Sequence, residues 1–381
     1  MLEMRKKVVI LGLIAVLIGT VQFMFLNTAT NAKLTKMSLK KSYSAVNKEP
    51  SEEESKAAQF LQLQMLNSQG IIPYLVNGGS PAAYGVSESI GQAMEYAALL
   101  GDATLFAKYA AIADRYFKAP TGYFYWKIEI ASQKGETSSA LVDDLRIAKA
   151  YLFAHEGNMG DYREQIAKLA QAIYEFDVDA KGYPCDYYDG ALQKKADEVS
   201  LFYLDVETME KLSKVNPKWS VPHNKAIQIL LNMPENKYGF YPQTFKINAK
   251  EYVWPASVNM VENLYTAMDV QYAGKSTAAL VQFLKGQVKK GKIYNHYNLD
   301  GTPAGEDEST AVYALATRFL AMNNERKAAD WCYHRTLDFQ INEQEALEGG
   351  FGEPETGLVY AFDQLEALLM LRMVETKNDS Q

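Results

Sequence analysis

The chain has 381 residues, of which 48% are hydrophobic and 12% aromatic, so it can bury a large core in one to three domains. Its net charge of −7 argues against nucleic acid as the main partner, because binding to phosphates requires a surplus of Lys and Arg on some face. The two cysteines, Cys185 and Cys332, cannot build a disulfide framework, and the four scattered histidines lack the spacing of metal ligands. The sequence therefore predicts neither a metal site nor a cofactor.

The N-terminal segment, residues 1–32, has the pattern of a segment that enters a membrane. Met1–Lys7 contains three basic residues, and Val8–Leu26 is an apolar run whose only strongly polar side chain is Gln22. Basic residues before an apolar run place the N-terminus in the cytoplasm and the rest of the chain outside the cell. Because the run is longer than the apolar part of most signal peptides, residues 1–32 are predicted to be an uncleaved single-pass anchor. A cleaved signal peptide, with Ala29–Ala32 as its cleavage site, is the alternative and would make the protein secreted.

Residues 33–55 are polar and are predicted to form a flexible stalk. From Lys56 onward the apolar residues recur with helical spacing, and a theme repeats: an apolar helix, a short turn, a second amphipathic helix and a loop rich in Gly and aromatic residues. The first helix of each unit is expected at Ser87–Leu100, from Asp143, and at Ser200–Leu212, Val258–Asp269, Ser309–Met322 and Gly357–Val374.

The interval between these helix starts predicts the architecture. The starts follow one another at nearly equal intervals of roughly 50–60 residues, as expected for a helical repeat, and are marked by Glu88, Asp144, Ser200, Asn259, Ser309 and Gly357. A single helical hairpin cannot bury its apolar face alone, so such repeats pack side by side. No hydrophobic run with the period of a strand stands out. We therefore predict an all-α fold over residues 56–375, an (α/α)6 toroid of six hairpins; an open superhelix is the alternative.

In such a ring the six first helices begin at one face, which brings Glu88 and Asp144 together. Ser87 is expected to cap its helix, and Glu88 then lies in the first turn, where the helix dipole favours a carboxylate. A capping role alone would explain this pair. Two carboxyl groups on one face are also the parts of a glycosidase, in which one donates a proton and the other activates water or attacks carbon.

Three segments of the chain resemble glycoside hydrolase family 8. Ser87-Glu88-Ser89-Ile90-Gly91-Gln92-Ala93-Met94, followed by Gly101-Asp102 and Phe106, resembles the family's acid motif. The segment from Asp144 to Ala150 is similar to its D-L-x-I-A-x-A motif, and Ser200–Tyr203 to its S-Y-F motif. The resemblance spans residues ~60–375 and implies an (α/α)6 fold with inverting hydrolysis of a β-linked glucan or amino-sugar polymer. With its predicted anchor, the chain most resembles the membrane-anchored exopolysaccharide hydrolases of Gram-positive bacteria in that family.

The resemblance implies Glu88 as the proton donor and assigns its partners less directly. Val142 stands where the family often has an Asp, so Asp143 and Asp144 are alternatives; the register of the motif favours Asp144 as the catalytic residue. The general base is expected on the first helix of the fourth repeat unit, where Glu262 is the first choice. Other carboxylates that could serve as the base are Asp205, Asp269, Asp197, Glu198 and Glu306.

Flat aromatic rings on the loops would offer surfaces on which sugars stack, although many of them also suit packing. The predicted substrate-binding residues are Tyr125, Trp126, Asp143, Tyr203, Asp205, Tyr241 and Trp254. The predicted function is an extracellular, membrane-attached, monomeric glycosidase that cleaves an exopolysaccharide without a cofactor. A polysaccharide lyase of the same fold and a non-catalytic glycan-binding protein associated with exopolysaccharide synthesis are the alternatives, and a protein-binding solenoid is a third.

Overall fold

The computed structural model describes residues 48–342, 346–353 and 355–374, which belong to one compact unit. The predicted anchor and the stalk up to residue 47 lie outside the described residues. Among the residues that are described, no helix is both long enough and apolar enough to cross a membrane. Cys185 and Cys332 are both free and buried.

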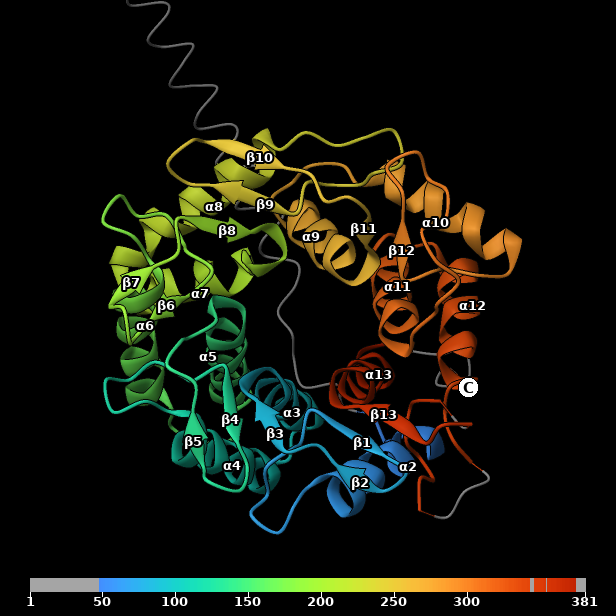
Figure 1. Cartoon of the computed structure of the whole chain (residues 1–381), viewed down its shortest axis with the longest axis horizontal. Coiled ribbons are helices and arrows are strands. Elements are labelled where there is room, and N and C mark those ends of the chain that lie inside the picture. The colour runs from blue at the N-terminus through green and yellow to red at the C-terminus, as the bar shows by residue number, and fades with distance from the viewer. Residues whose placement is uncertain (1–47, 343–345, 354, 375–381) are drawn as a thin grey trace, which may run out of the picture. The chain divides into compact units, whose positions relative to one another are not determined.

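Six helical hairpins form a closed ring, so the predicted toroid is confirmed within this unit (Figure 1). Each hairpin contributes one helix to the inside of the ring and one to the outside. The inner helices are α3 (Ser87–Leu100), α5 (Leu141–Glu156), α7 (Val206–Val215), α9 (Met260–Tyr272), α11 (Thr310–Met322) and α13 (Ala361–Met373). The outer helices are α2 (Glu52–Phe60), α4 (Ala103–Ile112), α6 (Arg163–Asp177), α8 (Ser220–Asn232), α10 (Ala278–Lys290) and α12 (Arg326–Leu337).

The two ends of the described chain close the ring. The last inner helix, α13, packs against the first inner helix, α3, and takes the N-terminal helix α2 as its outer partner. Glu54 and Arg372 join α2 to α13 in a fully buried ion pair with an O–N distance of 2.5 Å. Because Ser51 caps α2 and the helix begins at Glu52, the stalk boundary predicted at Ser55 is placed too late.

The first two inner helices approach each other closely because of a glycine. A Cβ atom at Gly91 of α3 would lie only 3.3 Å from side-chain atoms of Arg146 and Ile147 on α5. Almost every residue of α3 is buried, as expected for a helix enclosed by its own partner and by neighbours on both sides. This contact fixes the position of Arg146 relative to the first turn of α3.

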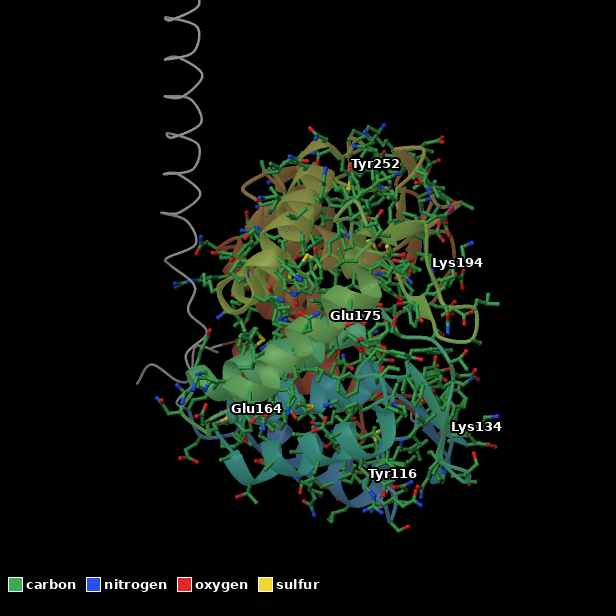
Figure 2. The ribbon with its side chains drawn as sticks, turned by 90° about the vertical axis from the view of Figure 1, so that its left-hand side faces the viewer. Tyr116, Lys134, Glu164, Glu175, Lys194 and Tyr252 are labelled. Carbon is green, nitrogen blue, oxygen red and sulfur yellow. The ribbon has the colours of Figure 1, made fainter. Side chains whose placement is uncertain are left out.

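Short strands lie in the connections that lead from each outer helix to the next inner helix, on the face where the inner helices begin; we call this the loop face. In Figure 2, Lys134 and Lys194, which lie in two of these connections, are on the same side of the unit, and Glu164 at the start of α6 is on the other. The strands are β1 (Leu75–Asn77), β2 (Ser80–Pro81), β3 (Tyr84–Val86), β4 (Lys127–Glu129), β5 (Lys134–Gly135), β6 (Tyr188–Asp189), β7 (Lys194–Lys195), β8 (Glu198–Ser200), β9 (Thr244–Lys246), β10 (Glu251–Val253), β11 (Val258–Asn259), β12 (His296–Tyr297) and β13 (Leu358–Tyr360).

These strands form five small antiparallel sheets, in the orders β13-β1-β2, β3-β4-β5, β6-β7, β8-β9-β10 and β11-β12. Each strand has only two or three residues, which is too short to produce a recognisable alternation of polar and apolar residues. The strands therefore left no sign in the sequence. The sheets connect the loops of neighbouring hairpins, because β1 pairs with β13 and β3 pairs with β4.

The third inner helix begins later than predicted. The segment expected to open a helix at Ser200 instead ends strand β8 there, makes a short 3-10 turn at Leu201–Tyr203, and enters α7 only at Val206. Asp205 caps α7, because its side chain accepts hydrogen bonds from the backbone N–H and hydroxyl of Thr208 at 3.0 and 2.8 Å. The short turn leaves Tyr203 on the loop face, outside the helix.

Candidate functional site

Glu88 lies in the first turn of α3, where the loop face meets the inside of the ring. Its side chain is 30% exposed, so a ligand can reach it, although protein atoms surround it closely. Burial raises the pKa of Glu88 to about 7; the positive charge of Arg146 opposes this shift, and the negative charges of Asp143 and Glu366 add to it. A carboxylic acid that keeps its proton near neutral pH is suited to general acid catalysis.

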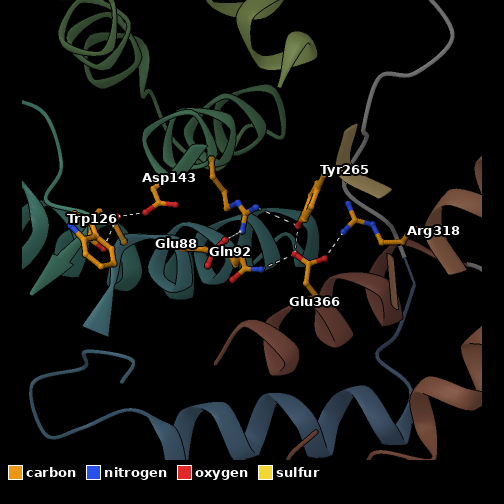
Figure 3. A network of polar contacts seen from close by, with 9 residues as sticks. Glu88, Gln92, Trp126, Asp143, Tyr265, Arg318 and Glu366 are labelled. Carbon is orange, nitrogen blue, oxygen red and sulfur yellow. Dashed lines mark hydrogen bonds and ion pairs between the residues drawn. The ribbon is translucent and has the colours of Figure 1, made fainter. Parts of the chain in front are cut away.

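Ser87 holds Asp143 beside Glu88. The prediction that Ser87 caps α3 is wrong, because the N-cap position is Val86 and the Ser87 hydroxyl has other partners. It donates to Oδ2 of Asp143 at 2.7 Å and also lies 3.3 Å from the carbonyl oxygen of Trp126 (Figure 3). Burial raises the pKa of Asp143 to about 6, while hydrogen bonds from Ser87 and from the backbone N–H of Glu88 limit that rise.

Asp144, the residue favoured by the motif, has a different environment. It is fully buried, and the carboxyl group that acts on it most strongly is Asp177 at the end of α6. Burial and the charge of Asp177 raise the pKa of Asp144 well above its usual range, and burial raises that of Asp177 to about 7. Asp177 in turn accepts a hydrogen bond of 2.6 Å from the hydroxyl of Ser139. Asp144 and Asp177 thus form a buried acid pair, and both have raised pKa values.

Arg146 is the cation of the site, and the sequence reading did not single it out. Its Nη1 atom lies 3.4 Å from Oε1 of Glu88, and its Nη2 atom donates to the hydroxyl of Tyr265 at 3.3 Å. Tyr265 donates to Glu366 on α13, so a polar network extends from Glu88 across the inside of the ring (Figure 3). The only feature of the sequence that could have pointed to Arg146 is its position two residues after Asp144. The link to Glu366 could not be read from the sequence, because Glu366 is far from both Glu88 and Arg146 along the chain.

Glu262 lies in the first turn of α9, where Asn259 caps the helix. Its Oε2 atom accepts a hydrogen bond of 3.0 Å from Gln243, and burial raises its pKa. It lines a pocket on the loop face together with Phe202, Tyr241, Pro242, Gln243, Pro255, Val258, Asn259, Asn263 and Thr266. The Tyr203 hydroxyl experiences the charges of Glu88, Asp143, Asp186 and Glu262, which together with burial raise its pKa. Tyr203 therefore lies within electrostatic range of both the predicted acid and the predicted base.

The other carboxylates considered as a base have partners or positions of their own. Asp269 is half-buried and accepts a hydrogen bond of 3.1 Å from the backbone of Val206 at the start of α7. Asp205 caps α7 and lies 3.9 Å from Lys149. Glu198 forms an ion pair with Lys246. Asp197 and Glu306 are exposed on loops.

The predicted aromatic residues differ in how accessible they are. Trp126 is 37% exposed, and the ammonium group of Lys127 lies 5.1 Å from the centre of its ring. Tyr125 and Trp254 are partly buried against the core. Tyr241 is only 2% exposed, and its backbone N–H donates to Asn263 at 3.0 Å, so its ring serves mainly as packing.

Three tyrosines that the sequence reading missed continue this surface. Tyr74 stacks on Tyr84 with ring centres 5.3 Å apart, and it meets Tyr360 edge-on at 5.6 Å. The charges of Glu88 and Asp363 contribute to a raised pKa of Tyr74, after burial and the two neighbouring tyrosines. These residues lie in or next to strands β1, β3 and β13, and their short strands carried no recognisable pattern.

Within the described ranges, no three His, Cys, Asp or Glu side chains are grouped closely enough to hold a metal ion. The chemical groups that the structure places at this site are its carboxyl groups, the guanidinium of Arg146 and its tyrosines. Acid–base cleavage of a glycosidic bond uses two carboxyl groups, one that donates a proton and one that acts as base or nucleophile.

Comparisons with known proteins bear on the fold. No protein-family model matches the chain. A candidate lipoprotein of Bacillus subtilis (strain 168), YdaJ, is 26% identical over 328 residues, which are 84% of this chain and 87% of YdaJ. An α-amylase from Clostridium perfringens has a similar structure, with a TM-score of 0.76 and 24% identity over 85% of this chain and 98% of that one.

Two further solved structures connect the fold to a family. PssZ from Listeria monocytogenes matches with a TM-score of 0.70 and 23% identity, over 87% of this chain and 98% of PssZ. Endoglucanase Cel10 from Klebsiella pneumoniae, described as a family 8 glycosyl hydrolase, matches with a TM-score of 0.60 and 15% identity, over 85% of this chain and 99% of Cel10. The chain therefore has the fold of the family 8 glycosyl hydrolases, and the resemblance inferred from its sequence motifs is confirmed at the level of the fold.

Proposed function

We propose that this protein is a glycoside hydrolase that cleaves a polysaccharide on the loop face, with Glu88 as the proton donor. The observation that carries the proposal is the environment of Glu88, which is reachable by a ligand and yet has a pKa raised to about 7. A surface carboxylate that only capped a helix would have no reason to be protonated at neutral pH.

The proposed mechanism uses three carboxyl groups. Glu88 donates its proton to the glycosidic oxygen as the bond from that oxygen to the anomeric carbon breaks. Glu262 takes a proton from a water molecule, which attacks the anomeric carbon from the opposite side and inverts its configuration. The location of Glu262 in a pocket and the electrostatic range of Tyr203 to both residues support this pairing.

Asp143 takes the role that the motif had suggested for Asp144. Asp143 is bonded to Ser87 and to the backbone of Glu88, so an ionised Asp143 lies where it can accept hydrogen bonds from the sugar beside the cleaved bond. Asp144 is fully buried against Asp177 and is better suited to holding α5 against α6. The sequence register alone could not separate two adjacent aspartates.

The substrate class is the least determined part of the proposal. Acid–base cleavage by inversion is possible for either anomeric linkage, because it depends on which face of the sugar the acid and the base approach. Endoglucanases with this fold favour a β-linked glucan or amino-sugar polymer. The α-amylase from Clostridium perfringens, with its TM-score of 0.76, favours an α-linked glucan as the second candidate.

We further propose that the enzyme acts outside the cell as a membrane-attached monomer. The apolar run at residues 8–26 supports attachment, as does the description of YdaJ as a candidate lipoprotein. Attachment is therefore proposed to occur through residues 8–26. Cell fractionation should find the full chain with the membranes and a chain lacking residues 1–32 in solution.

The test of the activity is the release of reducing ends from a panel of purified polysaccharides: exopolysaccharide from the source cells, mixed-linkage glucan, chitosan, xylan and starch. The full chain should cleave at least one, and Glu88→Gln should lower kcat by about 10³-fold, because the amide keeps the shape but has no proton to donate. Glu95→Gln is the matched control, since Glu95 lies on the same helix but pairs with Lys149 at 3.3 Å. Full activity of Glu88→Gln would exclude Glu88 as the acid, and a product with a new ultraviolet-absorbing double bond would identify a lyase.

A further inference from the structure

A second group of side chains lies beneath Glu88 and is not used by the proposed mechanism. Glu366 on α13 is fully buried, and its carboxylate accepts hydrogen bonds from three other inner helices. Gln92 on α3 donates at 2.7 Å, Arg318 on α11 donates at 2.9 Å, and Tyr265 on α9 donates its hydroxyl proton (Figure 3). A buried carboxylate needs such donors, because an unpaired charge inside a protein is strongly destabilising.

These hydrogen bonds do more than hold the inner helices together, because the network extends to Glu88, the proposed acid. Tyr265 also accepts a hydrogen bond of 3.3 Å from Arg146, whose other nitrogen lies 3.4 Å from Glu88. The contact with Glu88 is long for a bond between a guanidinium and a carboxylate, which is usually about 2.7–2.9 Å. Arg146 is thus shared between a carboxyl group that must keep its proton and a network that ends in a permanently paired carboxylate.

The position of Arg146 has a direct chemical consequence for Glu88. A guanidinium in close contact with a carboxyl group favours its ionised form and lowers its pKa by about 1–3 units. An ionised Glu88 could not donate a proton. A guanidinium that is withdrawn toward Tyr265 and partly neutralised by Glu366 favours the ionised form much less.

We propose that Glu366 is a positioning residue for the proton donor: through Tyr265 it holds Arg146 back from Glu88 and offsets its charge, so that Glu88 stays protonated before the reaction. After Glu88 has given up its proton, the same guanidinium stabilises the carboxylate that remains. The inference rests on the proposed role of Glu88 as the acid.

Several other charged or titratable groups lie near Arg146, Glu366 and Glu88. Glu95 on α3 adds negative charge near Arg146, and Asp363 lies near Glu366 on its own helix. The groups whose charge or hydroxyl lies near Glu88 are Arg146 and Asp143 on α5, Glu366 on α13, Tyr74 before β1, and Tyr203 in the 3-10 turn. Of these, only Arg146 is a cation, so a change in its position or its neutralisation acts on Glu88 without compensation from a second cation in that set.

The test compares the full chain with Glu366→Gln and Tyr265→Phe. Glutamine keeps the size of Glu366 but removes its charge, and phenylalanine removes only the hydroxyl that links Glu366 to Arg146. Both changes should lower the pKa of Glu88, so the alkaline limb of kcat/KM, where the acid is lost, should move to lower pH by about 0.5 unit or more. Tyr265→Phe also keeps the test possible if Glu366→Gln does not fold.

Glu54→Gln is the matched control, because Glu54 is also fully buried in an ion pair with an arginine of α13, Arg372, but no hydrogen bond or ion pair found in the described residues connects it to Glu88. It should lower the melting temperature and leave the pH profile unchanged. A shift of equal size in Glu54→Gln, or none in the two network variants, would overturn the inference.

A second readout does not depend on activity. Carbodiimides react with protonated carboxyl groups, so the pH dependence of the labelling of Glu88, read by peptide mass spectrometry, reports its pKa directly. The midpoint should fall in Glu366→Gln and in Tyr265→Phe relative to the unmodified chain. If the chain cleaves no polysaccharide but the midpoint shifts, the proposed function fails and the electrostatic inference holds; if it cleaves and the midpoint does not shift, only the inference fails.

Discussion

Asp143 and Asp144 are consecutive residues of α5, yet their carboxyl groups belong to two different regions of the molecule. Asp143 joins Ser87 and Glu88 at the loop face, where Glu88 is 30% exposed. Asp144 joins Asp177 in the buried acid pair between α5 and α6. Each region contains a serine that donates to an aspartate, Ser87 to Asp143 at 2.7 Å and Ser139 to Asp177 at 2.6 Å.

The difference between the two regions follows from the geometry of a helix. Consecutive residues project about 100° apart, so two adjacent carboxyl groups in a first turn cannot share the same neighbours. One helix start can therefore supply a reactive group to a surface site and a packing group to the core. Both carboxyl groups have raised pKa values because of burial, which shows that a shifted pKa alone does not identify a functional residue.

The largest difference between two variants is expected on α9, which also has one carboxyl group at the proposed site and one away from it. Glu262→Gln should lower kcat by about 10³-fold, because a general base that activates water contributes about 10²–10⁴-fold. Asp269→Asn, two turns further along α9, should change kcat by less than about 3-fold, since Asp269 does not line the pocket that Glu262 lines and is half-buried beside the start of α7. Steady-state kinetics on the cleaved polysaccharide provide the measurement. A large loss in Asp269→Asn with none in Glu262→Gln would place the base elsewhere.

The next contrast separates the adjacent aspartates themselves. Asp143→Asn should lower kcat/KM by about 10²-fold, because it removes a charged acceptor next to the proton donor. Asp144→Asn should keep kcat/KM within about 3-fold of the unmodified chain, because Asp144 is fully buried and cannot contact the sugar. The same kinetic assay checks both variants. The reverse order would restore Asp144, the choice made from the motif, as the residue that contacts the sugar.

The buried acid pair should instead control how stability depends on pH. In the folded state the pKa of Asp144 lies well above its unfolded value of about 4, and the pKa of Asp177 is about 7. Between the unfolded and folded pKa values, the folded state therefore binds more protons than the unfolded state. Stability should therefore fall as pH rises from about 5 to 8. Asp144→Asn removes one of these protons, so the stability of the variant should fall less over the same pH range. Urea unfolding at pH 5 and pH 8 measures the difference; an identical pH dependence in the variant would contradict the raised pKa of Asp144.

The smallest effects are expected from the two serines. Ser87→Ala should lower kcat/KM by about 10-fold, because Asp143 loses a donor that orients it. Ser139→Ala should leave kcat/KM unchanged and reduce the free energy of unfolding by about 1–2 kcal/mol, because Asp177 loses a buried hydrogen bond. Kinetics and urea unfolding of both variants make the comparison. If both serines affected only stability, the two regions would not differ in function.

Much of the fold could be predicted from the sequence because the repeat is long and regular. Helix starts at nearly equal intervals along the chain predicted six hairpins, and the structure shows them in a closed ring. The motif around Glu88 also indicated its place on the face where the inner helices begin. These features depend on local pattern and on spacing, which the sequence displays directly.

The parts that could not be predicted depend on contacts between distant segments. Ser87 was expected to cap α3, but its hydroxyl reaches Asp143, which is distant in the sequence, once α3 and α5 are packed together. Glu366 reaches Arg146 through Tyr265 only because the last inner helix closes the ring beside the first. The start of α7 was misplaced because its first turn is replaced by strand and 3-10 structure, which apolar periodicity does not distinguish from helix.

The central claim is that Glu88 donates a proton while a carboxylate on the opposite side of the sugar, Glu262, activates water. The most direct test is proton NMR of the first anomer that the full chain releases from a defined oligosaccharide of the cleaved polymer. The claim predicts that the new reducing end appears with the anomeric configuration opposite to that of the cleaved bond, and that Glu88→Gln releases it about 10³-fold more slowly. A product that first appears with the original configuration would contradict direct attack by water, and an unsaturated product would contradict hydrolysis itself.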